Sequence, residues 1–499
     1  MRAIAQSSLV AAAWVACPFL APACSGSRVT ASADAADEEQ SRVLHEASTG
    51  SEGDDAADGA TSLPWTSRHL ADGSPLAITS STDLVYVDST TRMHAIPLAG
   101  GAAVDVDPGL ALSGSSLGYG TLGGFFYVEA WKNQGAGGTL GIWSRATGSA
   151  LAPYQAVVGL PGIDPSGKWI LYGQPSATGG VDVMVASVGF AGAVNLATRS
   201  NAFFWNGAQA WLGQTAVVLS GPTLPTPDAG TLSLVLSAFA APSWQARTLS
   251  TRVDVPGVPG PVVPPMLLDP NGAGVVLVAN GGQLTFLPLD GSSPVVIESG
   301  ATPGYFLHDG SVIYATAAGL RASPAKAPAP VTLTSTGVTG FRALSPDENW
   351  VIFGDASGNV RLASTHTPGT DAVLGLDQGS QWFTADSTYA LLLTYDAGTL
   401  QGPLIATPVS GGPGRTVASE VSIIGVSPLS GTAMLVFDDV VTGASGYVQG
   451  NLDWIDVSST ALPTTIAKQF GGIFVVSNDG KHAAYADPTA GGVDVIDFP

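Results

Sequence analysis

The sequence predicts an all-β fold made of repeated four-stranded units, and three observations support this prediction. The 499 residues include 63 Gly and 35 Pro, the two residue types least suited to the interior of a helix. No amphipathic helical pattern continues for three turns anywhere after residue 64. Short apolar runs recur between turn signals at intervals near forty residues, the length of one blade of a β-propeller.

The first 23 residues have the features of a secretory signal peptide. Arg2 precedes the apolar run Leu9–Val15, which is too short to span a bilayer as a helix. Small residues follow, and Ala21-Pro22-Ala23 stands directly before Cys24. We therefore expect cleavage of the chain at this bond.

The segment before Cys24 resembles a bacterial lipobox, with Ala21 where that motif usually has Leu. The resemblance implies that the Cys24 thiol is lipidated, with Cys17 as the alternative acceptor, and that more than one acyl chain gives a stable anchor. Ser25 after the cysteine implies the outer membrane. Ordinary cleavage at the same bond, which would leave a soluble protein, is the alternative.

Residues 25–63 are rich in acidic and small side chains. They carry nine acidic residues and two Arg, with few residues that a core could bury. Such a segment stays disordered and is extended by its own charge repulsion. The expected organisation is a signal peptide over residues 1–23, a lipidated Cys with an acidic tether over residues 24–63, and a propeller over residues 64–499.

The charge of the chain excludes one class of function. Lys and Arg number 18 against 39 Asp and Glu, a formal net charge of −21. A nucleic-acid-binding protein needs a basic surface to displace counterions from phosphates, so we expect no nucleic-acid partner. Docking on an anionic membrane through charge alone is disfavoured for the same reason. Both cysteines precede the folded region, so no disulfide links its strands.

Three segments repeat most clearly: Asp164–Gly173, Ser345–Gly354 and Ser477–Ala486. Each is a polar turn followed by an apolar strand. Aspartate at such a turn caps nearby backbone amides, which predicts a structural role. The aspartates assigned to this role are Asp164, Asp347, Asp386 and Asp479.

These segments resemble the TolB-like and WD-like propeller repeats of bacterial envelope proteins. In those repeats a Ser-Pro-Asp-Gly-Lys turn precedes a strand that contains Trp, Ile or Ala and then Phe or Tyr. The resemblance covers roughly residues 64–499 and implies a propeller lipoprotein of the cell envelope. Such motifs are specific for the fold and carry little information on function.

The number of blades follows from aligning the turn residue that precedes each strand. The alignment predicts about eight to ten units, and one ring is favoured over two. Ser67–Leu70 is expected to supply the last outer strand and close the ring. The Pro-rich stretch 253–265 is the internal boundary if there are two rings. The ten aligned residues are Thr82, Gly123, Gly167, Gly213, Gly272, Gly310, Glu348, Ser387, Ser430 and Gly480.

One unit illustrates the expected strands of a blade. Phe341–Leu344, Trp350–Phe353, Val360–Ala363 and Ala372–Leu374 are predicted as its four strands. Gly358 and Asn359 supply the positive φ that a tight hairpin between the second and third strands requires. Weak alternation in the central strands is expected where neighbouring blades cover both faces.

Candidate catalytic and metal sites are weak in this sequence. Gly114–Gly118 matches the Gly-x-Ser-x-Gly elbow of serine hydrolases, but that elbow needs a strand and a helix of an α/β sheet. The six His have no metal-ligand spacing, and His94 and His482 are assigned to packing. Acidic pairs such as Asp438-Asp439 could bind calcium, but none fits the twelve-residue calcium loop. We assign no catalytic residue, cofactor or metal.

The favoured function is a non-catalytic, outer-membrane-anchored lipoprotein, monomeric and facing the periplasm or the cell surface, whose propeller binds a protein or glycan partner. Trp side chains on the rim could contact a sugar or a peptide. One alternative is a propeller enzyme, for example a metal-dependent lactonase or a polysaccharide lyase. The other is a structural surface protein without a specific ligand.

Overall fold

The computed structural model describes residues 65–498 with internal gaps. The gaps are residues 80–81, 107–115, 123–124, 132–137, 148–153, 177–180, 189–192, 201–208, 221–230, 257–265, 280, 397, 443–447 and 488–490. The described part contains 38 strands and one short 3-10 helix, η2 (Arg145–Thr147). It holds no helix of the length and hydrophobicity that crossing a membrane requires.

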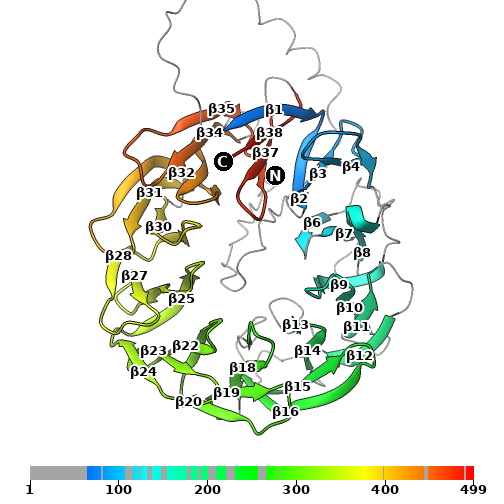
Figure 1. The fold of residues 1–499 in the computed structure, drawn as a ribbon, viewed down its shortest axis with the longest axis vertical. Helices are drawn as coiled ribbons and strands as arrows, with labels where there is room; N and C mark the ends of the chain where they lie inside the picture. Colours follow the sequence, from blue (N-terminus) through cyan, green and yellow to red (C-terminus); the bar gives the residue numbers. More distant parts are fainter. Residues whose placement is uncertain are drawn as a thin grey trace, which may run out of the picture.

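The strands form ten blades in a single ring (Figure 1). Six sheets have four strands, and two have seven strands because neighbouring blades share one long strand. β9 (Tyr154–Ile163) pairs with β8 near its start and with β10 near its end, and β32 (Arg415–Pro428) is shared by β31 and β33 in the same way. The all-β propeller and the single ring are confirmed, at the upper end of the predicted blade number.

Each blade has four antiparallel strands, numbered from the inside of the ring outward. Blade 1 is β2 (Ser74–Thr79), β3 (Asp83–Val87), β4 (Met93–Pro97) and β5 (Val104–Asp105). Blade 2 is β6 (Ser116–Leu122), β7 (Phe125–Trp131), β8 (Gly138–Trp143) and β9, and blade 3 is β9, β10 (Trp169–Pro175), β11 (Val181–Ser187) and β12 (Ala193–Ser200). Blade 4 is β13 (Gln209–Leu212), β14 (Thr215–Ser220), β15 (Thr231–Ala240) and β16 (Gln245–Pro256), and blade 5 is β17 (Leu267–Leu268), β18 (Gly274–Ala279), β19 (Gln283–Pro288) and β20 (Val295–Ser299).

The second half of the ring repeats this pattern. Blade 6 is β21 (Thr302–Phe306), β22 (Ser311–Thr316), β23 (Gly319–Pro324) and β24 (Val331–Thr334), and blade 7 is β25 (Val338–Leu344), β26 (Trp350–Asp355), β27 (Asn359–Ser364) and β28 (Ala372–Leu376). Blade 8 is β29 (Gly379–Phe383), β30 (Tyr389–Thr394), β31 (Gln401–Pro408) and β32, and blade 9 is β32, β33 (Ala433–Thr442), β34 (Val448–Asp456) and β35 (Thr464–Phe470). Blade 10 is β36 (Phe474–Val476), β37 (His482–Ala486), β38 (Val493–Asp497) and β1 (Thr66–Ala71).

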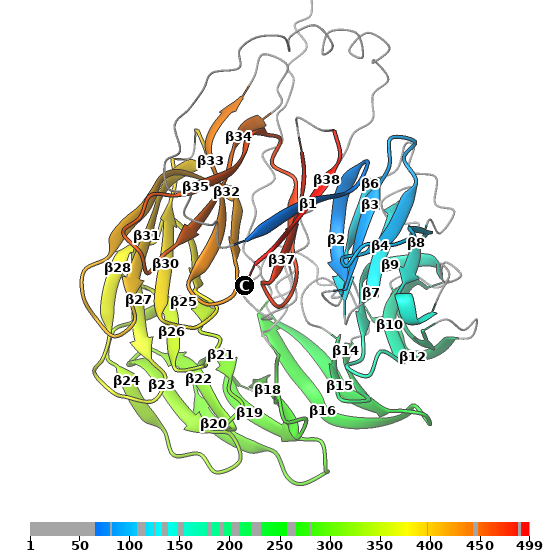
Figure 2. The same cartoon turned by 45° about the horizontal axis from the view of Figure 1, so that its top comes forward.

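The N-terminal strand closes the ring. β1 is the outer strand of blade 10, where it pairs antiparallel with β38 near the C-terminus (Figure 2). Thr66 lies opposite Asp497, and Arg68 lies opposite Val495. The predicted closing strand Ser67–Leu70 is therefore confirmed. Since strands distant in sequence form one blade, the ring has no free end between its first and last blades.

The core lies between the blades rather than within one central layer. Consecutive residues on the second strand of a blade are all buried: Val312, Ile313 and Tyr314 on β22 have no exposed surface. Ile313 packs toward blade 7, in a cluster with Phe353, while Tyr314 packs toward blade 5, in a cluster with Phe286. Both faces of the strand are covered, which explains why apolar and polar residues do not alternate in it.

The turn before the second strand requires a left-handed backbone. Most of the aligned turn residues are glycines, but Glu348 has φ 61° and Ser387 has φ 63°. In blade 9 the left-handed residue is Gly431, with φ 65°, so the aligned Ser430 is one position early. Gly123 lies outside the described residues. The aligned positions with a positive φ are Gly167, Gly213, Gly272, Gly310, Glu348, Ser387 and Gly480.

Candidate functional site

The carboxylate of Asp347 is bound within its own turn. It accepts hydrogen bonds from the Ser345 hydroxyl at 2.6 Å and the Asn349 amide at 3.1 Å, and the Ser345 hydroxyl accepts one from the Trp350 amide at 2.9 Å. Burial raises the pKa of Asp347, but the hydrogen bonds from Ser345 and Asn349 outweigh it and leave the pKa below its ordinary value. Asp386 accepts in the same way from the Thr384 hydroxyl and the Thr388 amide, and Asp479 from the Ser477 hydroxyl and the Lys481 amide. The Thr384 and Ser477 hydroxyls in turn accept from the amides of Tyr389 and His482.

Asp164 occupies a different place in its turn. Its fully buried carboxylate accepts hydrogen bonds from the amides of Ser166 at 3.1 Å, Lys168 at 2.7 Å and Trp169 at 2.6 Å. Asp164 thus takes the position of the Ser345 hydroxyl and not that of Asp347. All four turn aspartates accept hydrogen bonds from backbone amides, in agreement with a structural role in the turn.

Hydrogen bonds connect the turns of successive blades from blade 5 to blade 10, and we call this set the turn belt. Each bond joins a turn of one blade to the equivalent turn of the next. The turn belt consists of Asn271 to the His308 carbonyl (2.9 Å), the His308 amide to Glu348 (2.8 Å), the Asp347 amide to the Ser387 hydroxyl (3.0 Å), the Asp386 amide to the Gly431 carbonyl (3.3 Å) and the Ser430 amide to the Gly480 carbonyl (3.2 Å). These bonds fix the angle between neighbouring blades.

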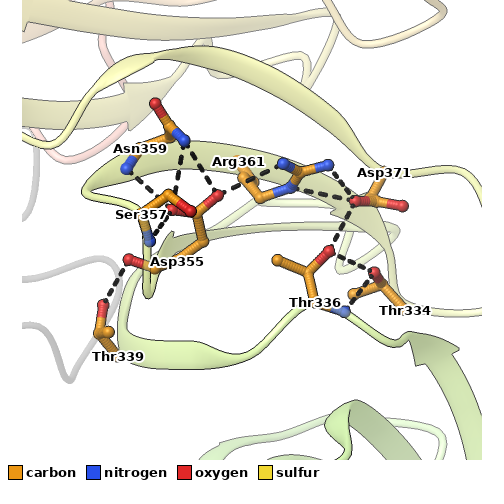
Figure 3. Close-up of polar contacts among 8 residues, drawn as sticks. All are labelled: Thr334, Thr336, Thr339, Asp355, Ser357, Asn359, Arg361 and Asp371. Carbon is orange, nitrogen blue, oxygen red and sulfur yellow. Dashed lines mark hydrogen bonds and ion pairs between the residues drawn. The ribbon is translucent and has the colours of Figure 1, made fainter.

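A second polar network holds the hairpin between β26 and β27 (Figure 3). Asp355 accepts hydrogen bonds from the amides of Ser357 at 2.8 Å and Asn359 at 2.9 Å, and the Asn359 amide is the main reason that the pKa of Asp355 is lowered. Arg361 lies between Asp355 at 3.3 Å and Asp371 at 2.5 Å. Thr336, which follows β24 of blade 6, also contacts Asp371, so the network joins two blades.

The same hairpin arrangement occurs in blade 1. Asp88 accepts hydrogen bonds from the amides of Thr90 and Arg92, and its carboxylate lies 3.0 Å from Nε2 of His94. An aspartate with amide partners two and four residues later and a basic residue six residues later is shared by 88–94 and 355–361. We did not predict this motif, although the repeated spacing is visible in the sequence. His94, assigned to packing, is a carboxylate partner, as is His482 with Asp497 at 2.8 Å.

Arginine side chains also join neighbouring blades. Arg68, Arg247 and Arg415 lie on the outer strands β1, β16 and β32. Each donates a hydrogen bond to the carbonyl that directly follows the third strand of the next blade, at Leu98, Leu289 and Val457. Arg145, Arg321, Arg342 and Arg361 form ion pairs with acidic side chains. These seven arginines are thus all engaged in contacts within the fold.

The tryptophans of the described part are packing residues. Trp65 contacts Trp454 and Phe498, and Trp244 packs edge-on against Trp169 and Trp211. Trp143 is 2% exposed, and Trp350 and Trp382 pack against buried clusters. Trp131 and Trp205 lie outside the residues whose side chains are described. The idea that rim tryptophans contact a sugar therefore finds no support among these eight side chains.

Exposed aliphatic side chains lie on the outer strands of three successive blades, and we call them the outer apolar strip. Figure 1 shows β20, β24 and β28 along one stretch of the circumference. Each of these strands pairs with the third strand of its blade through a β-bulge, which hinders pairing with a further strand. Contact with another molecule would thus use side chains. The strip consists of Val296, Val331, Val373 and Leu376, between 46% and 55% exposed.

The remaining candidates from the sequence are not brought together. Cys24, Cys17 and the signal peptide lie outside the described residues, and so do Gly114 and the side chains of the elbow around it. Within the described ranges, no three His, Cys, Asp or Glu side chains are placed so that they could hold a metal ion.

Comparisons with known proteins give only distant likenesses. No protein-family model matches the sequence, and no curated protein matches it. Among solved structures, the chain is similar to a eukaryotic initiation factor (TM-score 0.46, 13% identity, 77% of this chain and 94% of that chain) and to TolB from Acinetobacter baumannii (0.28, 11%, 60% and 77%). It is also similar to the tricorn protease (0.25, 10%, 85% and 51%), of which it spans about half the length.

Proposed function

We propose that this chain is an exported, lipid-anchored β-propeller of the bacterial cell envelope that binds a protein partner and does not catalyse a reaction. The observation that carries the proposal is the outer apolar strip. Exposed apolar groups on successive blades offer a partner surface to bury, and apolar burial is the main driving force of protein association. The turn belt favours this function because a rigid scaffold loses little conformational entropy on binding.

A protein partner fits these side chains better than a glycan. Every large apolar side chain that is exposed in the described part is Val, Leu or Ile, whereas the described tryptophans are buried or half-buried. Aliphatic side chains gain little from a polar sugar ring but bury well against the apolar surface of a protein. The acidic side chains on or next to these outer strands, Glu298, Asp371 and Asp377, are already paired with arginines, so the partner we expect presents an apolar segment to the strip.

The binding proposal is tested by site-specific crosslinking in native envelopes. A photoreactive amino acid is placed at Val331 or Val373 in the full-length tagged protein, and crosslinked species are identified by mass spectrometry. Leu462, which is 87% exposed in the loop between β34 and β35, is the matched control position. We expect one recurrent protein at positions 331 and 373 and not at 462.

The same partner should be lost when charge is placed on the strip. V331D/V373D should abolish co-purification of that protein, while L462D should retain it. Retention by V331D/V373D, or crosslinks of equal intensity at all three positions, would exclude the strip as the contact surface. Turnover of a lactone or a polysaccharide by the purified protein would replace the binding proposal with the enzyme alternative.

The anchor is tested separately by replacing the cysteines. C24A should move the protein from the membrane fraction to the soluble fraction, because the acyl chains are lost. C17A should leave the protein in the membrane. If C17A releases the protein and C24A does not, Cys17 is the acceptor; if neither variant releases it, the lipid-anchor proposal is wrong.

A further inference from the structure

Two buried aspartates lie side by side in the interface between blades 8 and 9. Asp438 is on β33 and Asp453 is on β34, where Val436 lies opposite Asp453 and Asn451 lies opposite Asp438. Both carboxyl groups are therefore on the face of the sheet that Val436 occupies. Val436 packs in a cluster with residues of β30 and β31, so this face looks toward blade 8.

The two carboxyl groups lack the partners that other buried aspartates have. Asp438 is 8% exposed and Asp453 is 6% exposed, and Oδ1 of each has no hydrogen-bond partner within the described residues. Asp164 and Asp355, which are buried to a similar degree, each accept hydrogen bonds from two or more backbone amides. A buried charge without a partner is costly, so the pair points to a ligand that neutralises it.

The smallest such ligand is a proton between the two carboxyl groups. Asp438 and Asp453 are within hydrogen-bonding range of each other, and two carboxyl groups can form a hydrogen bond only if one is protonated. The Thr465 hydroxyl, on the neighbouring strand β35, contacts Asp453. This hydrogen bond favours the charged form of Asp453, whereas burial favours its protonated form.

The charges that act on the pair from the surrounding elements are negative. Glu420 on β32 and Asp439, the residue after Asp438 on β33, both act on Asp438. Burial, followed by the charges of Asp453 and Asp439, raises the pKa of Asp438 to about 7, and burial also raises the pKa of Asp453. Since the two groups interact strongly, they titrate as a pair.

We propose that Asp438 and Asp453 form a proton-binding site that holds one shared proton at neutral pH and locks blade 9 against blade 8. Gln401 of blade 8 lies at the contact between blades 8 and 9 that we expect this proton to stabilise. Its side-chain amide donates to the Val440 carbonyl at 2.7 Å and accepts from the Val440 amide at 3.0 Å, two residues beyond Asp438. Loss of the proton leaves two negative charges buried beside these two hydrogen bonds. Their repulsion favours separation of blades 8 and 9.

The expected pH dependence follows from the raised pKa of the folded state. In the unfolded chain an aspartate titrates near pH 4, whereas the folded pair keeps its proton to about pH 7. The pair's contribution to stability is fully present below about pH 4 and is lost as the pH rises through about 7. Within this window the unfolding equilibrium constant rises up to about tenfold per pH unit.

The test compares the pH dependence of stability in matched variants of the full chain. D438N and D453N each replace one carboxyl with an amide that can donate to the other carboxyl. We expect both variants to lose the wild-type fall in stability between pH 5 and pH 7.5. D309N, at an exposed aspartate of blade 6, is the control and should keep the wild-type slope. Retention of that slope by D438N and D453N would overturn the proposal.

Spectroscopy, hydrogen exchange and calcium addition test the proton site without relying on the pH dependence of stability. Infrared difference spectra between pH 5 and pH 8 should contain the carbonyl band of a protonated carboxyl, absent from D438N. Hydrogen exchange at the Val440 amide, corrected for its intrinsic pH dependence, should accelerate as the proton is lost. If calcium stabilises the wild type at pH 7.5 but not D438N, the pair binds a metal ion and the proton-site proposal is wrong.

Discussion

Glu348 accepts a hydrogen bond from the backbone amide of His308 at 2.8 Å, and its other carboxylate oxygen lies 2.6 Å from Nδ1 of the His308 ring. The two residues are 40 positions apart, one blade length, and they occupy equivalent turns of blades 6 and 7. Glu348 also has a left-handed backbone, with φ 61°. A non-glycine residue with a left-handed backbone thus stands at a turn where its side chain joins two blades.

Substitutions at Glu348 separate its two roles. E348A removes the contact to His308 and keeps the left-handed backbone, so we expect it to lower stability by about 1–2 kcal/mol. E348G removes the contact but also relieves backbone strain of about 1 kcal/mol, so it should cost less than E348A. Thermal unfolding of both variants measures the difference. Equal losses would mean that the positive φ carries no cost.

Two turn glycines form a matched pair for testing the turn belt. A Cβ on Gly480 would lie 2.6 Å from the Ser430 amide nitrogen, whereas a Cβ on Gly310 would have no atom within 4 Å. Both residues have a positive φ, so G310A should cost about 1 kcal/mol from the backbone alone. G480A should cost roughly 1–3 kcal/mol more, because blades 9 and 10 must separate. Similar melting temperatures for the two variants would contradict this packing.

The turn and hairpin aspartates predict sensitivity to acid. Hydrogen bonds hold the pKa of Asp355, Asp347 and Asp386 below their ordinary values. Their stabilising contribution is present above the unfolded pKa near 4 and is lost as the pH falls through the lower folded values. We expect the melting temperature to drop between pH 4 and pH 2. D355N should be less stable than the wild type at pH 7 and should show a smaller drop, whereas an undiminished drop would contradict this assignment.

Arg68 connects the closing strand to both of its neighbours. It donates to the Leu98 carbonyl of blade 1 and lies 3.4 Å from Asp497 of blade 10. Because Arg68 is partly exposed, we expect R68A to cost about 1 kcal/mol, while R92A on an exposed turn of blade 1 should be neutral. Hydrogen exchange of β38 should increase in R68A before that of β22. If exchange rises equally in both strands, the ring does not open first between β1 and its neighbours.

The propeller fold could be predicted from the repeats in the sequence. A polar turn, an apolar strand of five or six residues and a hairpin signal recur at one blade length, and all these features are local. The strands predicted in 341–374 match β25 to β28, and the closing strand matches β1. Local turn chemistry also predicted that Asp347, Asp386 and Asp479 would cap amides. The shift from Ser430 to Gly431 arose because two adjacent small residues can both occupy a turn, and only the backbone shows which one is left-handed.

The contacts between blades were decided by the tertiary structure. Nothing near Glu348 in the sequence indicates His308, and nothing near Asp438 indicates that Asp453 lies beside it, because strand pairing and blade packing bring together residues that are 15 to 40 positions apart. The same holds for the tryptophans, whose burial depends on the neighbouring blade. The sequence determined the unit and its repetition, since these depend on local turns and strand periodicity. Which polar groups are paired, buried or exposed depends on the assembled ring, since those properties arise only when one blade packs against the next.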